Sequence, residues 1–181
     1  MELTTEFQEK TLEKSLLDLE KALEINLQEI IKIIVQLYDQ LFIKIKQNQE
    51  QGKLPIAHIN FYILRTSLKL GRYTCVLKAY TKDWYLDKEP IEIHHEADYV
   101  YKHYYNYANA MKSEQKKYIR ADFFKLQTFL IEQWDNYIPY IIFVLRSSLA
   151  DIIELDSFNF EKDENFKMSI GDYKDFEVRL L

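Results

Sequence analysis

The residues best suited to chemistry are a group of histidines and acids in the middle of the chain. His94, His95, Asp98 and His103 belong to its only histidine-rich cluster. Residues four apart lie on the same face of a helix, so His94 and Asp98 could both reach one zinc ion. A third ligand would have to come from elsewhere, because neither HExxH nor another complete zinc signature is present. A metal-dependent enzyme is therefore one alternative hypothesis.

Two arginines follow apolar runs of similar sequence. Arg65 lies in YILRTSL and Arg146 lies in FVLRSSL. An arginine at the edge of a core needs a carboxylate or a bound anion as its partner. The two interpretations are a shared anion pocket and two separate structural ion pairs, and the sequence leaves both open.

Residues 53–90 carry seven basic and three acidic side chains, although the whole chain has a net charge of −5. Its basic residues include Lys69, Arg72, Lys78 and Lys82, which alternate with aromatic residues. This mixture is typical of surfaces that bind single-stranded nucleic acid. The same charges could instead lie against the acidic N-terminal segment, so nucleic-acid binding is a second alternative hypothesis.

Five tyrosines lie close together between residues 99 and 107. Tyr104 and Tyr105 follow Tyr101 by three and four positions and so share one side of a helix with it. Tyrosine combines a large apolar ring with a polar tip, which suits protein interfaces. An ordinary half-buried helix in a tyrosine-rich chain explains the same run. We keep both interpretations.

The missing motifs and the cysteine content narrow the class of protein. The chain has no phosphate-binding loop, no GxSxG motif and no Rossmann fingerprint. Its single cysteine, Cys75, excludes an internal disulfide and suits a reducing compartment. The start is acidic, without the features of a secretory signal, and the apolar runs are shorter than the roughly 20 residues of a membrane span. We expect a cytoplasmic protein without a cofactor or a membrane segment.

The first 51 residues, which contain no glycine or proline, predict one long amphipathic helix. Leucine and isoleucine recur there in steps of three or four, at Leu12, Leu16, Leu19, Leu23, Leu27, Ile30, Ile34, Leu37, Leu41 and Ile45. From residue 30 onward the helix is apolar almost all round and should lie in the core, whereas its first half is one-sided and more exposed. A kink near Asn26 should divide the two halves.

The remaining segments predict an α+β fold in a single domain of residues 1–181. Residues 56–86 read as a β-hairpin or meander that reverses near Gly71 and has a third strand at 84–86, although residues 56–70 also fit a helix. Residues 96–155 read as three helices, at about 96–114, 117–135 and 139–155, and residues 157–181 as a hairpin that turns at Gly171. We expect these helices and the long N-terminal helix to pack on a small antiparallel sheet.

Taken together, these patterns favour a non-enzymatic protein that binds another protein. The expected contact residues are Leu12, Leu16, Leu19 and Leu23 on the long helix and Tyr101, Tyr104 and Tyr105 on the tyrosine-rich helix. The long helix could also form a homodimer, although a strict heptad fails at Asn26. No residue identifies the partner.

Overall fold

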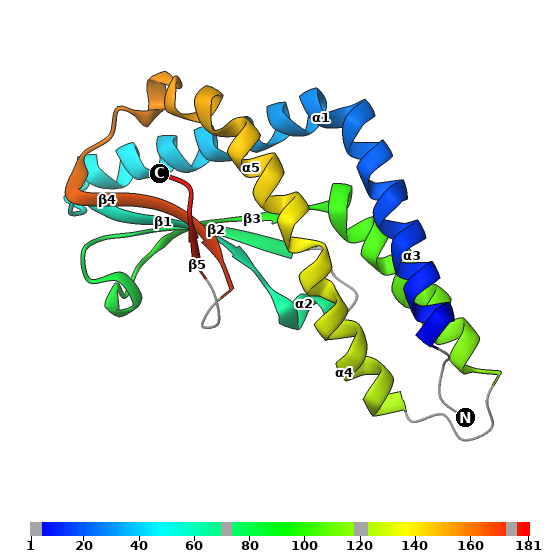
Figure 1. Cartoon of the computed structure of the whole chain (residues 1–181). Helices are drawn as coiled ribbons and strands as arrows, with labels where there is room; N and C mark the ends of the chain where they lie inside the picture. The colour runs from blue at the N-terminus through cyan, green and yellow to red at the C-terminus, as the bar shows by residue number, and fades with distance from the viewer. Residues whose placement is uncertain (1–4, 70–73, 118–122, 173–176) are drawn as a thin grey trace.

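The computed structural model describes residues 5–69, 74–117, 123–172 and 177–181, which form five helices of α type and five strands (Figure 1). The strands are β1 (Ile56–Ile63), β2 (Thr74–Tyr80), β3 (Ile91–Glu96), β4 (Lys162–Gly171) and β5 (Glu177–Arg179). The helices are α1 (Thr5–Glu50), α2 (Arg65–Lys69), α3 (Asp98–Gln115), α4 (Phe123–Gln133) and α5 (Ile138–Ile153). Three short 3-10 turns are η1 (Trp84–Leu86), η2 (Trp134–Asn136) and η3 (Asp156–Phe158). The α+β prediction is confirmed.

The five strands form one sheet in the order β3-β2-β1-β4-β5. β1 pairs antiparallel with β2 but parallel with β4, where Asn60 lies opposite Ser169. The sheet is therefore mixed, and the prediction of a wholly antiparallel sheet was wrong. The predicted third strand at residues 84–86 was also wrong. Those residues form η1, where Trp84 has a positive φ of 48° that is incompatible with a strand, and β3 follows it. The predicted reversal near Gly71 lies outside the described residues.

Helix α1 is continuous over 46 residues and bends between its two halves (Figure 1). Asn26, where the sequence predicts a kink, donates its side-chain amide to the carbonyl oxygen of Ala22 at 2.8 Å. Such a side-chain bond competes with the backbone ladder and promotes bending. The bend lets the second half of α1 follow the sheet while the first half extends past it.

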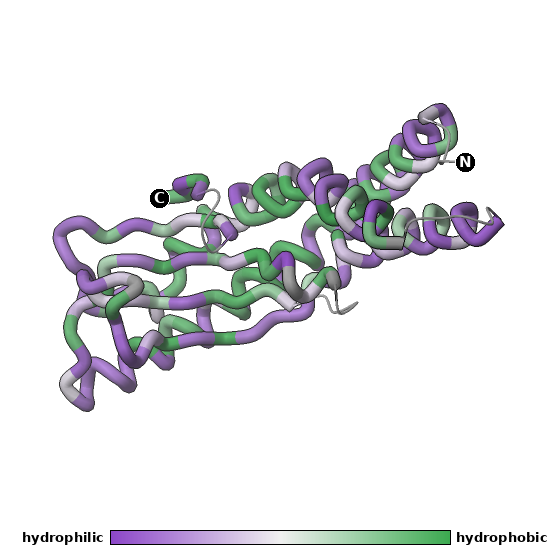
Figure 2. The backbone as a smooth tube through the Cα atoms, turned by 90° about the horizontal axis from the view of Figure 1, so that it is seen from below, coloured by the Kyte–Doolittle hydropathy of each residue, from purple (hydrophilic) through white to green (hydrophobic). Residues whose placement is uncertain are grey.

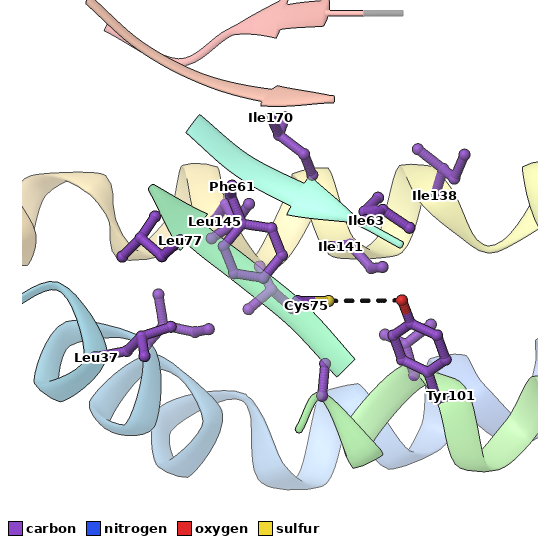
Figure 3. Close-up of a cluster of buried hydrophobic side chains, with 14 of the residues drawn as sticks. Leu37, Phe61, Ile63, Cys75, Leu77, Tyr101, Ile138, Ile141, Leu145 and Ile170 are labelled. Atoms are coloured by element: carbon purple, nitrogen blue, oxygen red, sulfur yellow. Dashed lines mark hydrogen bonds between the residues drawn. The ribbon is translucent and has the colours of Figure 1, made fainter. Parts of the chain in front are cut away.

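The core lies between the sheet and the helices α1, α3 and α5 (Figure 3). Phe61 of β1, Leu77 of β2 and Ile170 of β4 face Leu37 of α1 and Leu145 of α5. Successive residues of a strand point to opposite faces of the sheet, so only every second side chain of β1 points into this core. Cys75 is part of it and contacts the Tyr101 hydroxyl at 3.5 Å, and burial raises the pKa of the Cys75 thiol to about 12.

The opposite face of the sheet is covered by its own side chains, which include both apolar and polar residues. Ser169 donates its hydroxyl to the Asn60 side chain, which in turn donates to the Tyr62 hydroxyl at 2.9 Å. All three residues are buried. Beside them, the rings of His58 and Trp84 stack with centroids 4.2 Å apart. The Ser169–Asn60–Tyr62 chain satisfies these polar groups within the protein, whereas the buried His58 Nδ1 has no hydrogen-bond partner among the described residues.

One helical stretch of the described chain, Phe124–Ile153, is long and apolar enough to span a membrane. Core helices of water-soluble proteins meet the same criterion. Trp134, Ile141 and Leu145 of this stretch are buried in the core that joins it to the sheet.

Candidate functional site: a groove between α1 and α3

The first half of α1 and helix α3 extend together beyond the strands (Figures 1 and 2). Ser15 connects them, because its hydroxyl donates to the backbone carbonyl of His103 at 2.9 Å. The same hydroxyl accepts a hydrogen bond of 2.8 Å from the Tyr137 hydroxyl, and burial raises the pKa of Tyr137 to about 12. On the other side of α1, the Tyr140 hydroxyl of α5 donates to Glu20 at 2.7 Å. These bonds fix how α1 lies against α3 and α5.

A groove of about 500 Å³ lies along the side of α1 that faces α3. This volume is within the range of natural binding sites, roughly 300–1,000 Å³. Its walls come from both helices: Phe7, Lys10, Thr11, Lys14, Ser15 and Asp18 of α1, and His103, Asn106, Tyr107 and Ala110 of α3. The small side chains of Ser15 and Ala110 leave the space open, and the rings of Phe7 and Tyr107 make part of the lining apolar.

The border of the groove is more basic than the chain as a whole. Lys10 pairs with Glu6 at 2.6 Å, but Lys14 forms no ion pair with any described residue. His103 is half-buried, and burial, followed by the charge of Lys102, lowers its pKa, although Asp18 opposes the shift. The His103 ring is therefore neutral at pH 7, and the charge of the groove comes from its lysines and Asp18.

Ser15, His103 and Asp18 are the residue types of a hydrolytic triad, but they are not arranged as one. A triad requires the serine hydroxyl to bond to the histidine ring. Here the Ser15 hydroxyl donates to the His103 backbone carbonyl instead. With Tyr137 as its second partner, this hydroxyl stabilises the packing of helices.

Two tyrosines beside the groove give a test of the packing beneath it. The Tyr104 hydroxyl donates to the Leu130 carbonyl at 2.9 Å, whereas the buried Tyr107 hydroxyl has no partner among the described residues. Tyr104→Phe is expected to lower the free energy of unfolding by about 1 kcal/mol, and Tyr107→Phe to leave it unchanged or raise it. Urea unfolding measures both. A loss for Tyr107→Phe as large as that for Tyr104→Phe would show that its hydroxyl is bonded.

The structure places the predicted partner-binding residues mostly in the interior. Leu19, Leu23, Tyr101 and Tyr104 are buried, and Leu12 and Leu16 pack half-buried against the same core. Only Tyr105 is exposed. The leucine stripe and the tyrosine helix therefore belong to one packed core, because burying both removes apolar surface from water. The expected exposure was therefore wrong for Leu19, Leu23, Tyr101 and Tyr104. The role of the set in partner binding stays a prediction.

The predicted anion- or nucleic-acid-binding residues are dispersed. Arg65 pairs with Asp135 at 2.9 Å and with Asp172 at 2.7 Å, and Arg146 is exposed in the middle of α5. This supports the structural interpretation of Arg65. Lys78 pairs with Glu92 at 2.6 Å, while Lys82 is exposed after β2. Two basic residues remain. Lys69 is the last residue of α2, and Arg72 lies outside the described residues.

The predicted metal ligands do not converge. His94 and His95 lie in strand β3, not on a helix, so they point to opposite faces of the sheet. His94 contacts Glu92, and His95 packs against Tyr99, while Asp98 begins α3 and His103 lines the groove. No three His, Cys, Asp or Glu side chains in the described part of the chain are arranged to hold a metal ion. The helical spacing on which that hypothesis depended was wrong.

Sequence reasoning missed the groove residues Phe7, Lys14 and Ala110. Phe7 and Lys14 lie beside the leucine stripe of α1, and Ala110 lies on α3. The groove exists only because these two helices pack side by side. The pair of lysines at Lys10 and Lys14, next to the small residues Thr11 and Ser15, is the one signal that the sequence carries. No protein-family model, curated protein or solved structure matches this chain.

Proposed function

We propose that this protein is a protein-binding module and not an enzyme, and that its contact surface is the groove between α1 and α3. The supporting observation is the groove itself, which combines an apolar lining with a charged border on two helices extending beyond the sheet. Amphipathic surfaces of this kind are where proteins dock segments of their partners.

Binding of single-stranded nucleic acid has less support. The rings that would stack on bases must be accessible, but Tyr80 of the 69–85 segment is only 4% exposed. Lys78, two positions before Tyr80, is already paired with Glu92. A protein partner requires no such rearrangement of the sheet.

Filling the groove is expected to abolish capture of a partner. Ala110→Trp places a large ring in the groove, and Ala150→Trp makes the same change on the exposed side of α5, away from it. Tagged wild-type protein and both variants are used to capture proteins from a nuclease-treated extract of the native cells. We expect one stoichiometric partner with the wild type and with Ala150→Trp, and none with Ala110→Trp.

Circular dichroism and thermal unfolding establish that both variants fold. A partner retained by folded Ala110→Trp would place the contact surface elsewhere. If the wild type captured no protein at all, the proposed function would be contradicted.

A further inference from the structure

We infer that the occupant of the α1–α3 groove is an acidic amphipathic helix of a partner protein. This inference rests on the proposed function and specifies the chemistry of the partner. Its two supports are the shape of the groove and the sign of the charge along its border.

The shape of the groove matches a helix. The residues of α1 that line it run from Phe7 to Asp18, which at 1.5 Å per residue is about 17 Å, or three helical turns. The other wall, from His103 to Ala110, belongs to α3, which runs antiparallel to α1. A groove between two antiparallel helices is the position that a further helix takes in a helical bundle.

The charged lining of the groove is more basic than acidic, with Lys10 and Lys14 of α1 against Asp18. Lys10, Lys14 and Lys21 recur at helical spacing along α1, with the 46% exposed Leu17 between them. On α3, the exposed Lys102 precedes the groove residue His103 in the sequence. Of the acids, Asp18 lines the groove and Glu6 pairs with Lys10.

The acids of the first half of α1 lie mostly on a different side. Glu13, Glu20 and Glu24 form a separate stripe, and the hydrogen bond between Glu20 and Tyr140 directs this stripe toward α5. A chain with a net charge of −5 therefore presents a locally basic groove. Complementary charge selects partners and repels wrong ones, so the groove should select acidic helices.

Selection from a display library of 16-residue helices, balanced between acidic and basic members, tests this directly. The wild-type protein is the bait, and folded Ala110→Trp removes binders that do not use the groove. We expect the enriched helices to carry glutamate or aspartate beside an apolar stripe. Enrichment of neutral or basic helices, or no enrichment over the Ala110→Trp bait, would overturn the inference.

A charge reversal supplies a matched control. Lys14→Glu is expected to weaken binding of a selected acidic helix about tenfold, and Lys32→Glu, the same change at an exposed lysine of α1 away from the groove, to weaken it less than twofold. Equal effects of the two variants would contradict the inference. If a captured partner is lost with Ala110→Trp while no acidic helix is selected, the groove binds protein of another kind, and only this inference fails.

Discussion

Trp134→Ala is expected to lower the free energy of unfolding by about 4 kcal/mol. The Trp134 ring is fully buried and stacks on Tyr101 with centroids 4.4 Å apart and an interplanar angle of 29°. It also stacks on Tyr137 at 5.8 Å and meets the edge of Tyr104 at 5.1 Å. Removing it leaves a cavity where η2 meets α3, and large aromatic side chains give the largest losses of this kind.

Trp134→Phe separates the contribution of ring packing to stability from the effect of the buried indole nitrogen. The Trp134 indole nitrogen is buried without a hydrogen-bond partner among the described residues, so phenylalanine removes an unsatisfied donor as well as ring area. We expect a loss of about 1 kcal/mol, well below that of alanine. Guanidinium unfolding followed by circular dichroism measures both variants. A loss below 1 kcal/mol for Trp134→Ala would show that the ring cluster does not hold α3 to η2.

Leu19→Glu is expected to prevent stable folding, with a loss of at least about 4 kcal/mol. Leu19 is fully buried, so the variant would place a carboxylate in the core without a partner. Leu17→Glu makes the same change two positions earlier, at a side chain that is 46% exposed, and should change the stability by less than about 0.5 kcal/mol. The pair distinguishes a core stripe from an exposed contact stripe on the same helix.

Urea unfolding of the two leucine variants gives the comparison. The contradicting result is a Leu19→Glu protein that loses its partner without losing stability. That result would show that the leucine stripe is the contact surface, and it would contradict the burial described above.

The sequence predicts the helices well because the spacing of apolar residues and the positions of glycine and proline within one segment determine them. Helix α1 follows from an unbroken apolar period without glycine or proline, and the predicted helices near 96–114 and 139–155 correspond to α3 and α5. Strand β3 was missed, although Ile91 and Ile93 alternate there with Glu92 and His94. Its histidines and acids resembled the polar start of the following helix, so the period of two was overlooked.

Contacts between segments that are distant in the sequence could not be predicted from the spacing of residues within each segment. The parallel pairing of β1 with β4 joins residues more than a hundred positions apart, and nothing in either strand specifies the partner or its direction. Leu19 and Tyr104 each lie on a regular apolar stripe, but the sequence does not say that the two stripes cover each other. The groove is the space left beside that contact, so its residues have no shared sequence pattern.

The central claim is that the partner binds in the groove, and hydrogen–deuterium exchange of the captured complex tests it most directly. Partner binding should slow exchange in peptides covering residues 7–18 and 103–110, with the strands and the exposed side of α5 unchanged. Protection confined to the sheet or to α5, with α1 and α3 exchanging as in the free protein, would contradict the account.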